Sequence, residues 1–388
     1  MSTVNQTSTE YRTALNQLGY IVRRNQMTGE VEANGETYND IINARIQSQM
    51  WDLGYKNRKL VDDIVLVEAD DNSYHPIREQ LEKLEPWDGT PRIALLSTYL
   101  KPENPALAAV LLRKWMIAAV SKIYRETQNM ILVIQGEQGT GKSCFAKWIA
   151  SLFPPRYFTA DKLDPRDKDD KIKACSVAVW EIGELETTTT RADMGDLKRF
   201  ITQDAFTLRR PYARYSTREP VTASFIGTVN PAGGFLKDPS GNRRFWVFKS
   251  DGIDFEYSNV FNPADLWAEA YAAFKAGEDF TLTAEEAAAN EQEQSDVEIL
   301  DPVAEAIKVY FEIDPAHPEW ITTCNKVREV LTLKAALSPN QIAGQALGQS
   351  AQRLGLKSKS MRVKGEKNSV KCYPGVREKV IFPADNNN

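Results

Sequence analysis

A glycine-rich loop directly after a short apolar run most constrains how this 388-residue chain can fold. Residues 130–135 read MILVIQ, which is typical of a buried parallel strand, and residues 136–143 read GEQGTGKS. The loop fits the pattern G-x-x-x-x-G-K-[ST], whose glycines let successive backbone N–H groups face one anion. Residues 144–153 predict a helix, whose N-terminal end would add partial positive charge. Strand, loop and helix together predict a P-loop NTPase core.

The side chains of the loop predict how it would hold ATP and Mg²⁺. Lys142 would reach the β- and γ-phosphates, and the Ser143 hydroxyl would ligate the metal. Gly136, Gly139 and Gly141 would let the backbone turn around the phosphates. We expect these residues to contact the nucleotide: Gly136, Glu137, Gln138, Gly139, Thr140, Gly141, Lys142, Ser143 and Cys144.

A second apolar run, residues 174–180, is followed by two carboxylates. Its sequence ACSVAVW predicts another buried strand, and Glu181 and Glu184 come next. A P-loop NTPase needs one carboxylate near its Mg²⁺ and another to polarise the attacking water. Glu181 is the natural metal residue and Glu184 the natural base, but Ile182 stands where the second acid usually lies. The division of roles stays open, and so does the interpretation that one of the two is a surface glutamate.

A third apolar run ends in an amide, and a pair of arginines precedes a fourth. Residues 224–230 read SFIGTVN, and Asn230 could orient the hydrolytic water or touch the γ-phosphate. Alternatively, it starts a turn, since a proline follows. Arg243 and Arg244 suit contact with the γ-phosphate of a neighbouring subunit, or they form a salt-bridged surface pair.

A basic segment, FTLRRPYARYSTREP, lies between the acidic pair and Asn230. Extended runs flank it, which predicts a projecting hairpin. Its arginines could follow phosphates and its tyrosines could stack on bases. The candidate DNA-binding residues here are Arg209, Arg210, Tyr212 and Arg214. Two alternatives stay open: the charges protect a strand edge, or Arg209 and Arg210 serve the nucleotide at a subunit interface.

Composition limits the function classes. The net charge of −5 argues against a uniformly basic nucleic-acid binder, although local patches remain open. The four cysteines include no C-x-x-C pair and both histidines directly precede prolines, so a disulfide framework or zinc site is not expected. The N-terminal residues lack the features of a signal peptide, and no apolar stretch reaches the ~18 residues of a membrane span. We expect a cytoplasmic protein without a membrane segment.

Charge and periodicity divide the chain into four parts. Strands alternate with helices in the middle of the chain, which predicts an α/β domain with a mostly parallel sheet. Residues 277–314 carry 12 acidic side chains and one lysine, whereas residues 353–379 carry 9 basic and 2 acidic ones. The predicted parts are a helical N-terminal module (1–90), the P-loop core with flanking helices (91–275), an acidic helical linker (276–315) and a basic module (316–388).

The basic module resembles a winged helix. Helical segments are followed by the extended basic string LKSKSMRVKGEKNSVKCYPGV. One helix could enter a DNA groove while basic side chains contact phosphates. The candidates are Lys357, Lys359, Arg362 and Lys364. The alternative is an oligomerisation domain.

Four strings, HPIREQLEKLEPWDGTPRI, VIQGEQGTGKS, VWEIGELE and DPSGNRRFW, occur in this order and resemble the virulence-associated E family. That family belongs with the superfamily 3 helicases of the AAA+ type and is common in phages and mobile genetic elements. The resemblance covers residues 15–315. It implies an ATP-dependent replicative DNA helicase that forms a hexameric ring.

By motif match, the resemblance assigns nucleotide binding to Lys142 and Ser143, the acidic roles to Glu181 and Glu184, and the sensor role to Asn230. Arg243 or Arg244 would be the arginine finger. Residues 205–219 match the position of the DNA-tracking hairpin. Many relatives carry a primase-polymerase domain upstream, and no such activity is expected here.

The leading hypothesis is therefore an ATP-driven motor that translocates on single-stranded or forked DNA and separates the strands. The alternative is an ATP-switched origin-binding or helicase-loading factor that recruits host replication proteins. A third hypothesis is an ATPase that acts in interference between mobile elements.

Overall fold

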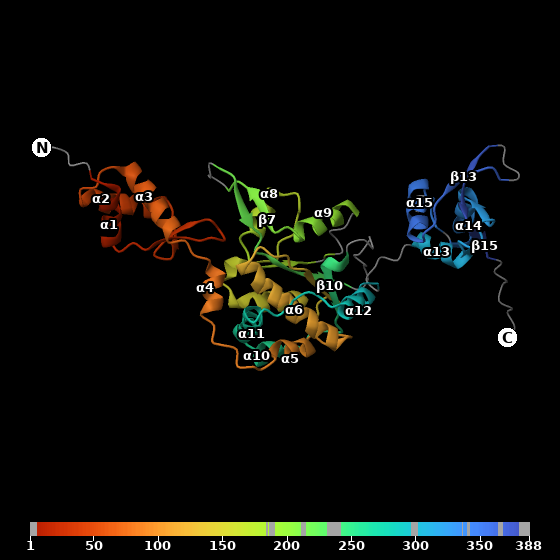
Figure 1. The fold of residues 1–388 in the computed structure, drawn as a ribbon, viewed down its shortest axis with the longest axis horizontal. Helices are drawn as coiled ribbons and strands as arrows, with labels where there is room; N and C mark the ends of the chain where they lie inside the picture. Colours follow the sequence, from red (N-terminus) through yellow and green to blue (C-terminus); the bar gives the residue numbers. More distant parts are fainter. Residues whose placement is uncertain are drawn as a thin grey trace. The chain divides into compact units, whose positions relative to one another are not determined.

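The computed structural model of the chain describes residues 6–183, 185, 191–210, 215–230, 242–295, 302–335, 337–339, 342–363 and 368–379. The chain forms two compact units, Met1–Glu298 and Ile299–Asn388 (Figure 1). The boundaries that the sequence predicts at residues 90, 275 and 315 stay predictions.

Small helices and three short strands form the N-terminal part of the first unit. The elements are α1 (Ser8–Gln17), β1 (Val22–Arg24), β2 (Val31–Ala33), β3 (Glu36–Thr37), α2 (Asp40–Asp52) and α3 (Arg58–Asp71). Thr7 and Glu10 cap α1 reciprocally, and Asn39 caps α2. Leu15, Ile46 and other buried side chains of the helices close an apolar core against the strands.

A five-stranded parallel sheet forms the centre of the first unit, in the order β10-β4-β9-β6-β5. Its strands are β4 (Ile131–Gln135), β5 (Phe158–Thr159), β6 (Val179–Ile182), β9 (Ser224–Val229) and β10 (Phe245–Lys249). Every pairing between them is parallel. This confirms the prediction of an α/β fold with a parallel sheet.

Helices cover both faces of this sheet (Figure 1). One face packs against a group that includes α6 and α11, and the other packs against α9. Successive residues of β4 alternate between the two cores: Leu132 and Ile134 join the first, Ile131 and Val133 the second. The helices of this part are α4 (Pro76–Glu82), α5 (Arg92–Tyr99), α6 (Pro105–Tyr124), α7 (Lys142–Ile149), α8 (Lys168–Ala174), α9 (Arg191–Ile201), α10 (Tyr257–Val260), α11 (Pro263–Lys275) and α12 (Ala284–Ser295).

Helix α6 is the most buried helix of this core, and polar contacts fix it to the sheet. The indole N–H of Trp115 donates to the Phe225 carbonyl oxygen at 3.0 Å. The Asn129 amide donates to the Trp115 carbonyl at 3.1 Å and to the Ser224 hydroxyl at 3.0 Å. Since a buried polar group needs a partner, these bonds set the position of α6 along β9.

The antiparallel hairpin of β7 (Ala205–Leu208) and β8 (Thr217–Pro220) has a fixed base. Nε of Arg210 donates to the two Glu219 carboxylate oxygens at 3.0 and 2.9 Å. Its terminal nitrogens also donate to the carbonyl oxygens of Thr28 at 2.5 Å and Met27 at 2.7 Å. Arg210 thus ties the hairpin to the turn between β1 and β2, nearly two hundred residues earlier in the chain.

The second unit has the order helix, strand, strand, helix, helix and three strands. The elements are α13 (Pro302–Tyr310), β11 (Phe311–Ile313), β12 (Ile321–Thr323), α14 (Cys324–Ala335), α15 (Gly344–Arg353), β13 (Lys359–Met361), β14 (Val370–Pro374) and β15 (Val376–Glu378). Strand β14 pairs with both β12 and β13. The three helices enclose a core that includes Ile307, Phe311 and Leu331. Across the described part of both units, no helix combines the length and apolar character of a membrane span.

We expect Arg210→Ala to lower the free energy of unfolding by ~3 kcal/mol, because the largely buried Glu219 carboxylate would lose its charged partner. Urea denaturation followed by circular dichroism measures this change. Arg209→Ala is the matched control, because the neighbouring side chain is exposed and such substitutions usually stay within ~0.5 kcal/mol. Equal losses in the two variants would contradict the role given to Arg210.

Candidate functional site

The loop between β4 and α7 is shaped by glycines at positions that no other residue would fit well. Gly139 and Gly141 have φ values of 82° and 94°, the left-handed region that favours glycine. A Cβ atom at Gly136 would lie 2.7 Å from the Ser250 carbonyl oxygen, and one at Gly141 would lie 2.5 Å from the Phe255 ring. The loop therefore lies in close contact with Ser250 and Phe255, which follow β10.

Lys142 is the first residue of α7, and its ammonium is held within the loop. It donates to the carbonyl oxygens of Gly136 at 2.5 Å and Glu137 at 2.7 Å, and it lies 3.5 Å from Oδ1 of Asn230. The side chain is 7% exposed. A cation fixed beside a turn of glycines gives this loop a local positive charge of the kind that anions bind.

Glu181 on β6 lies next to Ser143, the second residue of α7. Side-chain hydrogen bonds join its carboxylate to Ser143 and to Thr228 of β9. Burial raises the pKa of Glu181, while these two hydrogen bonds oppose the rise. Only 2% of the residue is exposed. The sequence does not identify Thr228 as a residue of the site, although it lies in the predicted strand SFIGTV.

The donor set fits a magnesium ion. No group of three or more His, Cys, Asp or Glu side chains among the described residues could hold a metal by itself. Mg²⁺ is usually bound through one or two carboxylates together with substrate phosphates and water. The Ser143 hydroxyl and the Glu181 carboxylate beside a glycine-rich loop form such a partial set.

The order of the strands brings the predicted residues together. β9 lies between β4 and β6, so Asn230, directly after β9, lies between the elements that carry Lys142 and Glu181. All three residues thus belong to one region at the carboxyl side of the sheet, where ligands of open parallel sheets commonly bind. Glu184 lies outside the described residues.

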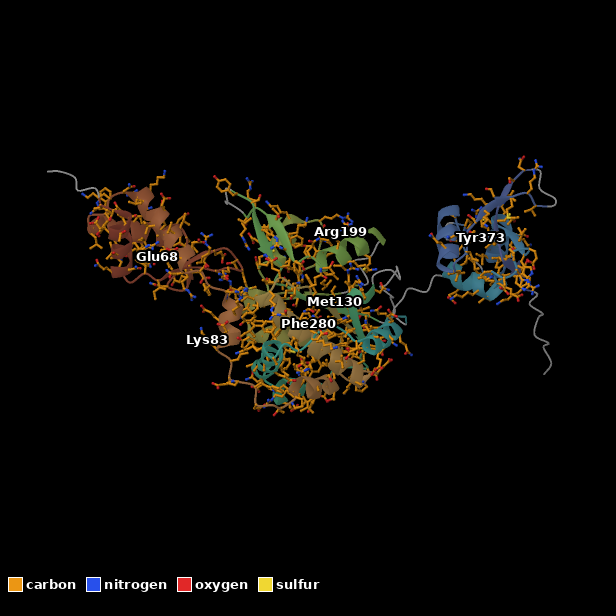
Figure 2. The ribbon with its side chains drawn as sticks, in the orientation of Figure 1. Glu68, Lys83, Met130, Arg199, Phe280 and Tyr373 are labelled. Atoms are coloured by element: carbon orange, nitrogen blue, oxygen red, sulfur yellow. The ribbon has the colours of Figure 1, made fainter. Side chains whose placement is uncertain are left out.

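Arg243 and Arg244 lie at the amino ends of the parallel strands, opposite to the glycine loop. They precede β10, whose residues Phe245–Lys249 pair in register with Ile131–Gln135 of β4. At ~3.3 Å per residue, the length of β4 separates the two arginines from the glycine loop of the same chain by ~16 Å. The arginines line a pocket of about 740 Å³, together with Met130 and Phe280, which Figure 2 labels.

The candidate DNA-binding residues differ in how they are engaged. Arg209 is exposed, whereas Arg210 is held in the contacts at the hairpin base. Tyr212, Arg214 and Lys364 lie outside the described residues. In the second unit the exposed basic side chains at and beside β13 are Lys357, Lys359 and Arg362.

We expect Glu181→Gln to be more stable than the wild type at pH 8 without metal, and equally stable near pH 4. Below its ordinary pKa of 4.5 the carboxyl group is protonated in both states. Above it the unfolded chain ionises first, so the wild type loses stability until the folded carboxyl group also ionises. The Gln variant has no such loss.

Thermal unfolding in EDTA across this pH range measures the difference. Glu137→Gln, which changes an exposed glutamate of the same loop, is the control. A lower melting temperature for Glu181→Gln at pH 8 would contradict the burial argument.

Comparison with solved structures shows a similar fold elsewhere. The apo structure of the NrS-1 C-terminal region has a TM-score of 0.55 and 12% sequence identity, with 96% of this chain and 100% of that chain covered. The A form of the same region has a TM-score of 0.53 and 13% identity, with 94% and 98% covered. At these identities the similarity concerns the fold alone. No curated protein matches the chain.

The sequence itself gives the family. The family model of the virulence-associated protein E-like domain matches residues 81–299, which is more than half of the chain. This range includes the glycine loop, Glu181, Asn230 and the two arginines. The chain therefore belongs to the family of virulence-associated protein E-like domains, as its motifs predicted.

Proposed function

We propose that this protein is an ATP-dependent DNA motor, a P-loop ATPase of the superfamily 3 helicase-like AAA+ type that acts in replication of a phage or mobile element. One observation carries the proposal: Lys142, the Ser143–Glu181 pair and Asn230 meet at one glycine loop on the carboxyl side of a parallel sheet. A cation, a metal-type donor pair and an amide around an anion-binding loop are the parts that phosphoryl transfer requires.

In this proposal Lys142 and the N–H groups of residues 136–144 hold the phosphates of ATP, while Ser143 and Glu181 hold Mg²⁺. The metal would neutralise charge that develops on the γ-phosphate. Asn230 or Glu184 would orient the attacking water. Burial keeps the Glu181 carboxylate in a region of low dielectric, where its attraction to a cation is stronger than in water.

The position of the two arginines supports a ring of subunits. Arg243 and Arg244 are ~16 Å of strand away from their own glycine loop, which is too far for contact with the same nucleotide. A neighbouring subunit whose glycine loop faces this edge would bring them to its γ-phosphate. We therefore propose a homo-oligomer, a hexameric ring, in which each ATP site is completed by the next subunit.

DNA would contact the hairpin and the second unit. Arg209, together with Tyr212 and Arg214, would follow the strand at the hairpin. The second unit has a helix pair, α14 and α15, followed by a two-stranded basic ribbon, β13 and β14, which supports the winged-helix interpretation. There Lys357, Lys359, Arg362 and Lys364 would contact phosphates.

We expect Lys142→Ala to lower ATP hydrolysis by ~100-fold or more, because one fixed cation at the transferred phosphate would be lost. Strand separation of a forked duplex should disappear with it. The measurements are phosphate release with and without single-stranded DNA, and a strand-displacement assay. Unwinding by the variant would contradict the motor. Hydrolysis by the wild type without any unwinding would favour the loading factor.

We also expect two inactive variants to restore activity when they are mixed. Lys142→Ala keeps its arginines, and the double variant Arg243→Ala, Arg244→Ala keeps its loop, so a mixed interface would contain one complete site. Hydrolysis should rise above the sum of the separate proteins. Mixing Lys142→Ala with Glu181→Gln is the control, because both changes lie on the loop side. No gain in the first mixture would contradict a finger supplied by the neighbour.

A further inference from the structure

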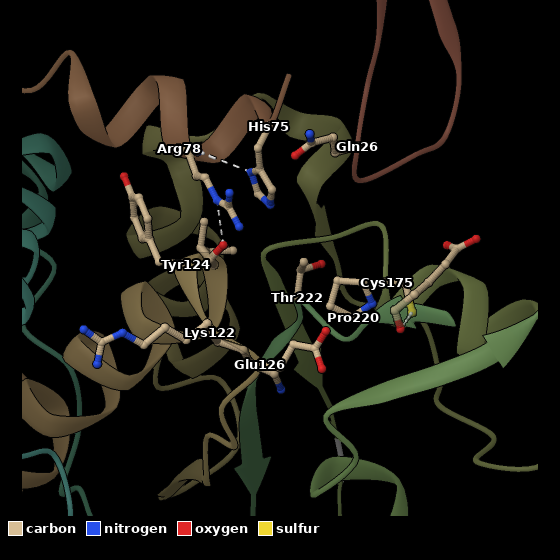
Figure 3. A pocket seen from close by; sticks show the side chains of 12 residues that line it. Gln26, His75, Arg78, Lys122, Tyr124, Glu126, Cys175, Pro220 and Thr222 are labelled. Atoms are coloured by element: carbon tan, nitrogen blue, oxygen red, sulfur yellow. Dashed lines mark hydrogen bonds between the residues drawn. The ribbon is translucent and has the colours of Figure 1, made fainter. Parts of the chain in front are cut away.

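His75 and Arg78, which belong to the string HPIREQ, line a pocket that the proposed function does not use. The pocket has a volume of about 350 Å³ and lies between the start of α4, the end of α6 and the segments that lead into β6 and β9 (Figure 3). It is thus on the amino side of the sheet, away from the glycine loop. His75 and Arg78 project from α4 toward Thr222 across this pocket (Figure 3).

Arg78 is anchored at one nitrogen and presents the others. Its Nε donates to the Ile123 carbonyl oxygen at 2.9 Å, and its guanidinium carbon lies 5.4 Å from the centre of the Tyr124 ring. Within the described part of the chain, its two terminal nitrogens make no hydrogen bond or ion pair. A planar fork fixed at its stem suits two oxygens of one phosphate group.

Lys122 is a second cation of this pocket, and it is almost fully buried. The residue is 2% exposed, and its ammonium donates one hydrogen bond, to the Ala223 carbonyl oxygen at 2.8 Å. An ammonium has three donors, so two remain. Burial lowers the pKa of Lys122 to about 8, and the charge of Asp204 opposes this shift.

His75 adds a neutral donor. Its Nδ1 accepts a hydrogen bond from the backbone N–H of Arg78 at 3.4 Å, which leaves the proton on Nε2. The residue is 9% exposed, and no described residue is bonded to Nε2. Burial and the Arg78 charge lower the pKa of His75 to about 4, so the ring is neutral at physiological pH.

The acidic side chains that line the pocket are already paired. Glu219 accepts three hydrogen bonds from Arg210, and Glu126 forms an ion pair with Arg218. Burial raises the pKa of the Cys175 thiol to about 12, so it carries no negative charge. The two carboxylates of the pocket lining are therefore held by arginines of the hairpin and not by Arg78 or Lys122.

We propose that this pocket is a second anion site, which binds a phosphate group through Arg78, Lys122 and His75. The ligand is either a phosphodiester of a nucleic acid strand or a free phosphate or phosphate ester. The site does not depend on ATP hydrolysis, because none of its residues belongs to the glycine loop or its partners.

The test uses Lys142→Ala protein, so that the glycine loop does not contribute to binding. Inorganic phosphate is titrated in a calorimeter at constant ionic strength. We expect saturable binding with one site, weakened at least ~10-fold by Arg78→Gln, since a bidentate charged contact would be lost. Lys83→Gln, at the exposed end of the same helix, is the matched control and should leave binding unchanged.

Lys122→Met is the second variant, because an apolar side chain of similar length tolerates burial where Arg78→Gln could unfold the site. It should also weaken phosphate binding. Thermal unfolding shows that each variant is folded. The proposal is overturned if phosphate does not bind, or if neither variant weakens its binding.

Competition distinguishes the two sources of the phosphate group. If single-stranded oligonucleotide displaces phosphate, and Lys122→Met weakens oligonucleotide binding as well, the ligand is a nucleic acid backbone. If phosphate binds unchanged in saturating oligonucleotide, the ligand is a free phosphate or ester. Both results are measurements of binding and do not require ATP hydrolysis, which Lys142→Ala is expected to lose. Failure of the proposed motor and failure of this site are therefore separate outcomes.

Discussion

The parallel pairing of β4 with β9 and of β9 with β6 is the constraint on which the candidate site depends. Parallel strands end at the same edge, so residues that follow three different strands meet there without any long loop. Antiparallel pairing of β9 would move Asn230 to the far edge, away from Lys142. The apolar side chains that alternate into two cores maintain this pairing, and they thereby hold the polar residues together.

The apolar strands of the central sheet that have four or more residues, and the glycine loop, can be predicted from the sequence because their signals are local. The string MILVIQ followed by GEQGTGKS predicts a strand, a turn and a helix, and β4 and α7 lie there. Strands β1, β2 and β3 were not predicted. Each has three residues or fewer, and β1 and β2 are stabilised by packing against α3 rather than by local propensity.

The surroundings of the basic segment depend on residues that are distant in the sequence. The sequence predicts one charged hairpin with four arginines. In the structure, Arg210 and Arg218 are paired with Glu219 and Glu126, so the local excess of positive charge is smaller than their number suggests. The partners of Arg210 at Met27 and Thr28 are too distant in sequence for any pattern to predict. Similarly, nothing in the sequence indicates that Phe255 lies against Gly141.

The clamp at the hairpin base also limits how the hairpin can move. Arg210 bonds to Glu219 on β8 and to two backbone carbonyls of the turn between β1 and β2, so a hinge motion of the hairpin relative to that turn would break these bonds. A displacement of β7 and β8 that keeps these hydrogen bonds therefore also moves the turn between β1 and β2.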